Sequence, residues 1–303
     1  RAIWFLQEMV PESTAYNIAR AARIRSRVDV EALRSAFQSL IDRHPGLRTT
    51  FAGVNGEPVQ QVAEKIEVCF EAVEARGWSE PQLHAALSAQ SGRPFSLVHG
   101  PVFRVHLYCL SEQDYVLQVA VHHIVSDFWS LALLFDEAGK LYAARLRNSD
   151  PQLPALDRSY ADFVAWQREQ LAGAEGDDLW SYWKQELSGE LAPLSLPLDH
   201  PRPPALNFRG ASRPFALNQE LTEKLKHLGR QQQATLFSAL MAAFHVLLHR
   251  LTDQKEIIVG SPTAGRPRAE FADIVGYFVS PVPLRSEFHP SMTFSQLLFQ
   301  MRG

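Results

Sequence analysis

The chain has 303 residues, of which 46% are hydrophobic and 21% charged, values typical of a soluble globular protein and unlike those of a disordered one. Thirty Lys and Arg residues against 33 Asp and Glu give a net charge of −3, which lacks the basic footprint of a protein that binds nucleic acid or an anionic membrane. With no transmembrane-length apolar run, no signal peptide and only two cysteines, Cys69 and Cys109, we expect a cytoplasmic, reducing location and no disulfide framework. The chain opens on Arg1 rather than Met, inside an apolar pattern, and we therefore expect a piece of a longer protein.

The first half of the chain alternates helix and strand signals. Asp29 can cap a helix whose apolar residues recur at helical spacing, and Ser79 to Gln82 match a capping box. A turn-prone Val54-Asn55-Gly56 separates two short strand patterns. We predict helices at residues 28–41, 79–90 and 129–146, and strands at 47–51, 58–62, 103–109 and 115–121.

The second half is richer in proline. Proline-containing linkers are predicted at 148–156 and 193–204, helices at 160–171, 178–187, 220–231 and 235–251, and strands at 213–217, 256–260 and 277–285. Because helices and strands alternate throughout, the predicted fold class is α/β or α+β. The proline-rich middle predicts two lobes with a boundary near residues 150–200.

The sharpest local feature is a pair of adjacent histidines, His122 and His123, between a predicted strand and a predicted helix. Functional groups often project from loops at strand ends. Because neighbours on an extended chain point to opposite faces, one histidine can face a cleft while the other faces the core. This geometry, with no Cys/His cluster nearby, counts against a metal site. Asp127 can contact His123 or point toward an arginine, and for such a dipeptide alone packing or capping is the commoner role.

Other candidates are weaker by themselves. The segment from Arg43 to Arg48 reads as a helix end with surface charges, and Tyr160 to Trp166 reads as an aromatic core face. Arg266, Arg268 and Glu270 lie in a polar loop, where charged side chains are usually solvated. Phosphate loops, nucleophile elbows and paired-carboxylate patterns are missing from the sequence, which gives no support to nucleotide or glycoside hydrolysis.

Taken in order, these segments resemble the condensation domains of nonribosomal peptide synthetases. The resemblance spans nearly the whole chain, and five motifs in the right order make it specific. The matching segments are residues 4–6, 43–51, 122–127, 160–166, 275–279 and 284–285.

The resemblance implies two lobes like chloramphenicol acetyltransferase, arranged in a V with a tunnel between them. The later family motifs would lie beyond residue 303, so the second lobe is expected to be incomplete. We therefore expect an N-terminal lobe at 1–155, a helical linker at 156–192 and the beginning of a C-terminal lobe at 193–303.

The resemblance also implies an amide-forming acyltransferase. It would join an upstream acyl or peptidyl thioester to the amine of a downstream aminoacyl thioester. No cofactor is expected to bind the chain directly, because the phosphopantetheine arms belong to the donor and acceptor carrier proteins. Those carriers and adjacent synthetase domains are the expected partners, with no nucleic acid and no membrane.

By position, the resemblance makes His123 the catalytic residue, with His122 and Asp127 as structural partners. It favours Arg48 as the ion-pair partner of Asp127, with Arg43 as the second choice. No metal ligand is implied.

The implied substrate tunnel would include Phe128, Trp129, Ser261 and Ser280. Phe128 stands where the family usually has glycine, and Ser280-Pro281 where it usually has Asn-Thr. The ring of Phe128 would either narrow the acceptor path or pack against the following helix.

Thioester aminolysis needs a neutral amine, and a histidine can take the amine's proton as general base or can hold and position it. The sequence leaves both roles of His123 open. It also leaves open an ester-forming or coenzyme-A-dependent acyltransferase of the same superfamily, and a non-catalytic domain that only docks carrier proteins.

Overall fold

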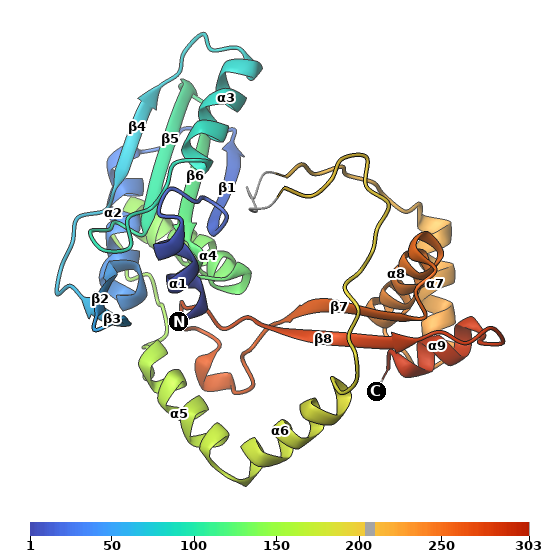
Figure 1. Ribbon diagram of the computed structural model, residues 1–303. Coiled ribbons are helices and arrows are strands. Elements are labelled where there is room, and N and C mark those ends of the chain that lie inside the picture. Colours follow the sequence, from blue (N-terminus) through green and yellow to red (C-terminus); the bar gives the residue numbers. More distant parts are fainter. Residues whose placement is uncertain (204–209, 303) are drawn as a thin grey trace. The chain divides into compact units, whose positions relative to one another are not determined.

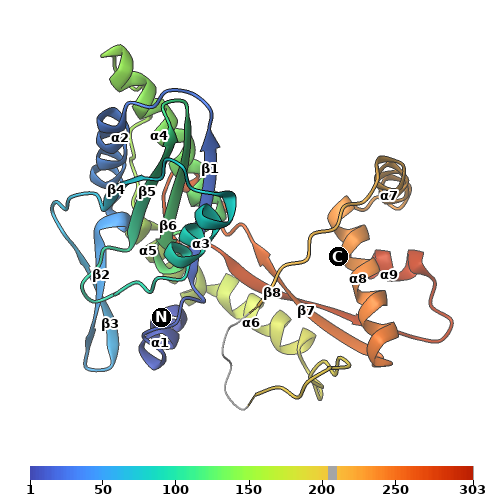
Figure 2. The same cartoon turned by 90° about the horizontal axis from the view of Figure 1, so that it is seen from above.

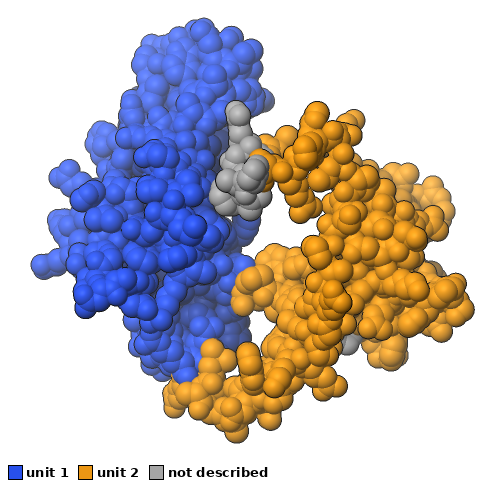
Figure 3. Space-filling model, in the orientation of Figure 1, with its two compact units in different colours: residues 1–168, 264–279 blue, residues 169–263, 280–303 orange. Residues whose placement is uncertain are grey.

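The computed structural model describes residues 1–203 and 210–302, which divide into two compact units (Figure 3). Unit 1 contains residues 1–168 and 264–279, and unit 2 contains residues 169–263 and 280–303. The predicted mixed α/β class is confirmed. Unit 1 extends past the boundary expected at residue 155 and also includes a segment, 264–279, from the region expected to form the second lobe. Pro204, the last residue of the predicted second linker, lies outside the described residues.

Unit 1 is built on a four-stranded sheet in the order β1-β6-β5-β4 (Figure 1). Its strands are β1 (Asn17–Ile24), β4 (Phe70–Glu74), β5 (Phe103–Ser111) and β6 (Asp114–His122). The pairs β1–β6 and β5–β6 are antiparallel, whereas β4 and β5 are parallel. The strands predicted at 103–109 and 115–121 are confirmed, while β1 and β4 were not predicted.

Helices cover both faces of this sheet. α2 (Val30–Arg43) and α4 (Phe128–Arg147) lie on one face, and α3 (Glu80–Ser91) lies on the other (Figure 2). The predicted caps are confirmed, because the Asp29 side chain accepts the Ala32 N–H and Ser79 forms a capping box with Gln82.

The main core fills the space between the sheet and the pair α2 and α4. Its buried side chains include Phe37 of α2, Leu107 of β5, Val121 of β6 and Leu134 of α4. Burying each large apolar side chain contributes about 1.5–3 kcal/mol. This packing fixes the end of β6 and the start of α4, and the two histidines lie in the turn between them.

Shorter elements complete unit 1. They are α1 (Ala2–Met9), which was not predicted, the 3-10 turns η1 (Pro45–Arg48), η2 (His123–Val125) and η3 (Ala269–Phe271), the predicted hairpin β2 (Thr49–Val54) and β3 (Glu57–Val62), and most of α5 (Tyr160–Ala172).

Unit 2 contains an antiparallel pair of strands, β7 (Glu256–Thr263) and β8 (Ser280–Glu287). Its helices are α6 (Ala174–Glu186), α7 (Gln219–Gln231), α8 (Leu236–Thr252) and α9 (Phe294–Gln300). The strand predicted at 213–217 is wrong, since these residues have no strand partner and Phe215 is 87% exposed. The strand predicted at 277–285 begins only at Ser280. Among the residues that the structure describes, no single helix is long and apolar enough to cross a membrane; α7 and α8 reach that length only together, with a 103° bend between them.

Candidate active site

The turn that carries the two histidines is held at both ends. β6 ends at His122, the η2 turn follows, and α4 begins at Phe128 with Asp127 as its N-cap. The backbone N–H of His123 donates to the carbonyl of Tyr16 at 2.8 Å, which ties the start of the turn to the segment before β1. A short turn therefore connects a buried strand to a buried helix with little freedom.

His122 faces the interior and is fully buried. Its Nδ1 accepts the Ile124 N–H at 3.1 Å, so its proton resides on Nε2, which donates to Oε1 of the buried Gln7 at 3.3 Å. Burial, with a smaller contribution from the charge of His123, lowers the pKa of His122 to about 4. His122 is therefore a neutral structural residue at neutral pH.

His123 is only partly buried, and the expected difference in burial between the two histidines is confirmed. Its Nδ1 lies 2.7 Å from the carbonyl oxygen of Ser126. A carbonyl can only accept, so Nδ1 carries the proton and a neutral ring keeps its lone pair on Nε2. Within residues 1–203 and 210–302, Nε2 has no hydrogen-bond partner. The ring packs edge-to-face against Tyr277, with centroids 5.1 Å apart.

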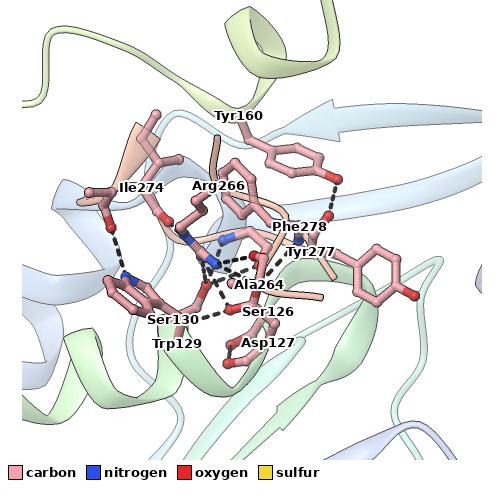
Figure 4. A network of polar contacts seen from close by, with 12 residues as sticks. Ser126, Asp127, Trp129, Ser130, Tyr160, Ala264, Arg266, Ile274, Tyr277 and Phe278 are labelled. Atoms are coloured by element: carbon pink, nitrogen blue, oxygen red, sulfur yellow. Dashed lines mark hydrogen bonds and ion pairs between the residues drawn. The ribbon is translucent and has the colours of Figure 1, made fainter. Parts of the chain in front are cut away.

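Asp127 points away from His123 and forms a buried ion pair with Arg266 (Figure 4). The Arg266 Nη1 donates to Oδ2 at 2.8 Å and Nη2 donates to Oδ1 at 3.2 Å. The same carboxylate accepts the N–H of Ser130 at 2.7 Å and that of Phe278 at 3.2 Å. Asp127 has no exposed surface, and the side chain of Arg266 is 5% exposed. The charge is therefore matched and hydrogen-bonded, as a buried carboxylate requires.

The expected pairing of Asp127 with Arg48, or with Arg43, is wrong. Arg48 donates through Nη1 to the carbonyl of Ala63. Arg43 is bound to the buried Glu137 of α4, with Nε 3.1 Å from Oε2. His44 contacts the same Glu137 oxygen at 2.6 Å. Both arginines are thus engaged elsewhere, in the contacts that hold the end of α2 and the following turn.

A second centre of this network is Ser130, on the first turn of α4. Its Oγ accepts from Arg266 Nη2 at 2.8 Å and from the Gly276 N–H at 3.1 Å, and it donates to the Gly276 carbonyl at 3.0 Å (Figure 4). Gly276 is required here, since a Cβ at this position would lie 2.3 Å from the ring of Tyr160. Tyr160 donates its hydroxyl to the Tyr277 carbonyl at 2.6 Å. Burial, followed by the nearby Asp127 charge, raises the pKa of Tyr160 to about 12.

The segment 264–279 is therefore clamped onto the start of α4. The sequence interpretation of Arg266 as a solvated loop charge is wrong, and the contributions of Ser130 and Tyr277 were missed. The available signal was the apolar and aromatic motif at residues 275–279, which pointed to this segment without identifying its partner.

The predicted tunnel residues are distributed over both units. Phe128 and Trp129 begin α4 in unit 1 and are 59% and 55% exposed. Phe128 adopts helical backbone angles, so its position does not need the conformational freedom of glycine. Trp129 donates its indole N–H to the Ala272 carbonyl at 3.0 Å. Ser261 is buried on β7 and Ser280 begins β8, both in unit 2, and their place in a tunnel stays a prediction.

Within the described ranges, no three Cys, His, Asp or Glu side chains gather in a way that could hold a metal ion. A pocket of about 420 Å³ lies behind the η2 turn and is lined by Ile124, Val125 and Gly276 among others. His123 is not among its lining residues.

Comparison with known proteins gives the same assignment along the whole chain. A family model described as "Condensation domain" matches residues 1–303. A component of the linear gramicidin synthase of Brevibacillus parabrevis is 38% identical over 304 residues, which cover 99% of this chain and 4% of that protein, so the chain spans only a small part of this relative. The X-domain from teicoplanin biosynthesis superposes with a TM-score of 0.89 at 26% identity, covering 99% of this chain and 66% of the solved one. The first condensation domain of the calcium-dependent antibiotic synthetase shares the fold, with a TM-score of 0.83 at 21% identity over 99% of this chain and 70% of that one. The chain therefore belongs to the condensation-domain family of nonribosomal peptide synthetases.

Proposed function

We propose that this chain forms an amide bond between a donor acyl or peptidyl thioester and the amine of an acceptor aminoacyl thioester. Donor and acceptor are both attached to carrier proteins through phosphopantetheine arms. His123 is the catalytic residue, and its Nε2 is the reacting atom. The carriers and the neighbouring synthetase domains are the partners of the reaction.

The observation that carries this proposal is the fixed tautomer of a partly exposed histidine. The hydrogen bond from Nδ1 to the Ser126 carbonyl, 2.7 Å long, leaves the Nε2 lone pair free. α-Amino groups have a reference pKa of about 7.7–8.0, so the acceptor amine needs a group that takes its proton near neutral pH. General base catalysis by a positioned histidine typically contributes about 10²–10⁴ in rate.

The reaction follows from that geometry. The amine nitrogen attacks the thioester carbonyl carbon, and its proton passes to Nε2 as the C–N bond forms. The C–S bond then breaks, and the proton leaves with the donor arm's sulfur as a thiol. The Nδ1–H bond to the Ser126 carbonyl supports the imidazolium that exists between these steps. A purely positioning role for His123 would use the same Nε2 atom as a hydrogen-bond acceptor.

Asp127 acts on the reaction only through the shape of the turn. Its carboxylate is saturated by Arg266, Ser130 and Phe278, and it has no contact with His123. Asp127 and Arg266 are accordingly positioning residues.

The test replaces His123 by alanine in the chain's native polypeptide. Condensation is measured by mass spectrometry with loaded donor and acceptor carrier proteins, and folding by circular dichroism. We expect at least about a hundredfold loss of rate with the fold retained. His84→Ala, which removes an exposed histidine from α3, is the matched control. Unimpaired product formation by the His123 variant would remove His123 from the site.

The acceptor and the pH profile decide between the remaining interpretations. A matched acceptor that offers a hydroxyl instead of an amine separates amide formation from ester formation. Carrier binding without any product would identify a docking domain. If His123 is the general base, the rate rises with pH through a single deprotonation that the His123→Gln variant lacks.

A further inference from the structure

An arginine and a phenylalanine form an exposed pair beside the histidine turn. Phe128, the first residue of α4, directly follows Asp127 and has a side chain that is 59% exposed. The guanidinium of Arg20, on β1, lies over the Phe128 ring with Cζ 4.7 Å from its centroid. The aromatic ring holds the cation in place through its quadrupole.

The guanidinium of Arg20 has no carboxylate partner among the described residues, in contrast to its neighbour on the same strand. Arg23 binds Asp114 through Nε at 2.8 Å and Nη2 at 2.6 Å, and it binds Glu80 as well. Within the same described ranges, Arg20 donates only to the carbonyl of Ala19, at 3.2 Å. One cation of β1 is therefore neutralised, and the other is held against a ring with its N–H groups available.

The pair lies close to the proposed reacting atom. In the β1–β6 register Asn17 is opposite His122 and Arg20 is opposite Val119, three residues away. Three residues of a strand span about 10 Å, and the Arg20 side chain extends toward Phe128, five residues after His123. A group bound there belongs to the reacting end of a thioester, because the long phosphopantetheine arm keeps the body of its carrier protein away from the reacting carbon.

We propose that Arg20, held by Phe128, binds a carboxylate on one of the two substrates, so that the chain prefers an acidic acyl or aminoacyl thioester. This inference rests on the proposed condensation reaction and names the substrate class of the same site. A planar guanidinium offers two parallel N–H groups to a carboxylate, and stacking on a ring reduces the freedom that binding must remove.

The test compares aspartyl with asparaginyl thioesters, which are nearly equal in shape and differ in charge. Each is presented once as donor and once as acceptor to the native polypeptide, and kcat/KM is measured. For one charged hydrogen-bonded contact we expect the wild type to prefer aspartyl by about tenfold to a hundredfold in one of the two positions. Arg20→Gln should remove that preference and leave the asparaginyl rate unchanged. Arg20→Lys and Phe128→Leu should retain only part of it.

The control is Arg25→Gln, which removes an exposed cation just beyond the end of β1. It should leave the preference intact, since Arg25 is not stacked on Phe128. Equal wild-type rates for the two thioesters overturn the inference. So does an Arg20→Gln variant that slows both thioesters equally, which would place Arg20 against the carrier or its arm. Failure of the proposed function is seen separately, as asparaginyl condensation that survives His123→Ala.

Discussion

Replacing Arg266 by alanine removes the cation that neutralises a carboxylate with no exposed surface. Asp127 would keep the N–H groups of Ser130 and Phe278 but would lose both bonds from the guanidinium. Removing one partner of a buried ion pair costs about 3–5 kcal/mol. Two hydrogen bonds to a charged group, each contributing about 1.5–3 kcal/mol, give the same order.

Unfolding of the whole chain, followed by near-ultraviolet circular dichroism, measures this loss. For domains of 150–250 residues each kcal/mol corresponds to a shift of about 2–4 °C, so we expect the Tm to fall by about 6–20 °C. Arg268→Ala is the matched control. This residue lies in the same segment with half its side chain exposed, and its loss should change stability by no more than about 0.5 kcal/mol.

A double-mutant cycle separates the ion pair from the remaining contacts. The double variant Asp127→Asn with Arg266→Gln carries no buried charge, and it should be more stable than the sum of its single variants predicts. If Arg266→Ala unfolds within about 1 kcal/mol of the wild type, the backbone N–H groups alone satisfy Asp127 and the reasoning is refuted.

Two further predictions concern stability. The pKa of His122 lies near 4, below the unfolded value of about 6.5, so the unfolded chain binds the extra proton between these pH values and stability falls as pH falls through that window, by up to about 3 kcal/mol. Urea midpoints measured from pH 7 to pH 4 should show this slope, and His122→Gln should flatten it; an unchanged slope in that variant would contradict the assignment. Gly276→Ala should destabilise the chain by about 1–3 kcal/mol, because its Cβ would lie 2.3 Å from Tyr160. Gly139→Ala on α4, where a Cβ meets nothing within 4 Å, should instead raise the Tm, and equal melts for the two variants would show that Tyr160 moves aside freely.

Elements with strong local signals could be predicted from the sequence. α2 and α3 were found because an N-cap residue precedes a helical apolar pattern, and the structure contains both caps. β5 and β6 were found because apolar side chains alternate along each of them. In these elements the residues that determine the conformation lie within a few positions of one another, so a single sequence contains the necessary information.

β1 was missed because its stability comes from its neighbour. Its sequence, Asn17–Ile24, holds three alanines and two arginines, which are poor strand formers, and most of its side chains are exposed. All eight residues pair in register with β6. The segment 213–217 shows the opposite case, since it has an apolar strand pattern but no partner strand.

The partner of Asp127 could not be found by local reasoning either. Arg266 lies 139 residues further along the chain, in a loop whose composition is typical of solvated charge. Arg43 and Arg48 are nearer in sequence, but Glu137 and the Ala63 carbonyl engage them. The choice among the three arginines depends on the segment 264–279 folding back onto unit 1, which the sequence does not reveal.

The two histidines show how the same turn produces two different chemistries from one residue type. In His122 the Nδ1 atom accepts the Ile124 N–H, whereas in His123 the Nδ1 atom donates to the Ser126 carbonyl. The backbone of one short turn therefore places the His122 proton on Nε2 and keeps Nε2 of His123 free. Asp127 immediately follows the carbonyl that sets the His123 tautomer, and Arg266 fixes Asp127 from the opposite side of the loop. Loss of this ion pair should thus impair catalysis by releasing the Ser126 carbonyl, even though neither charged group touches the imidazole.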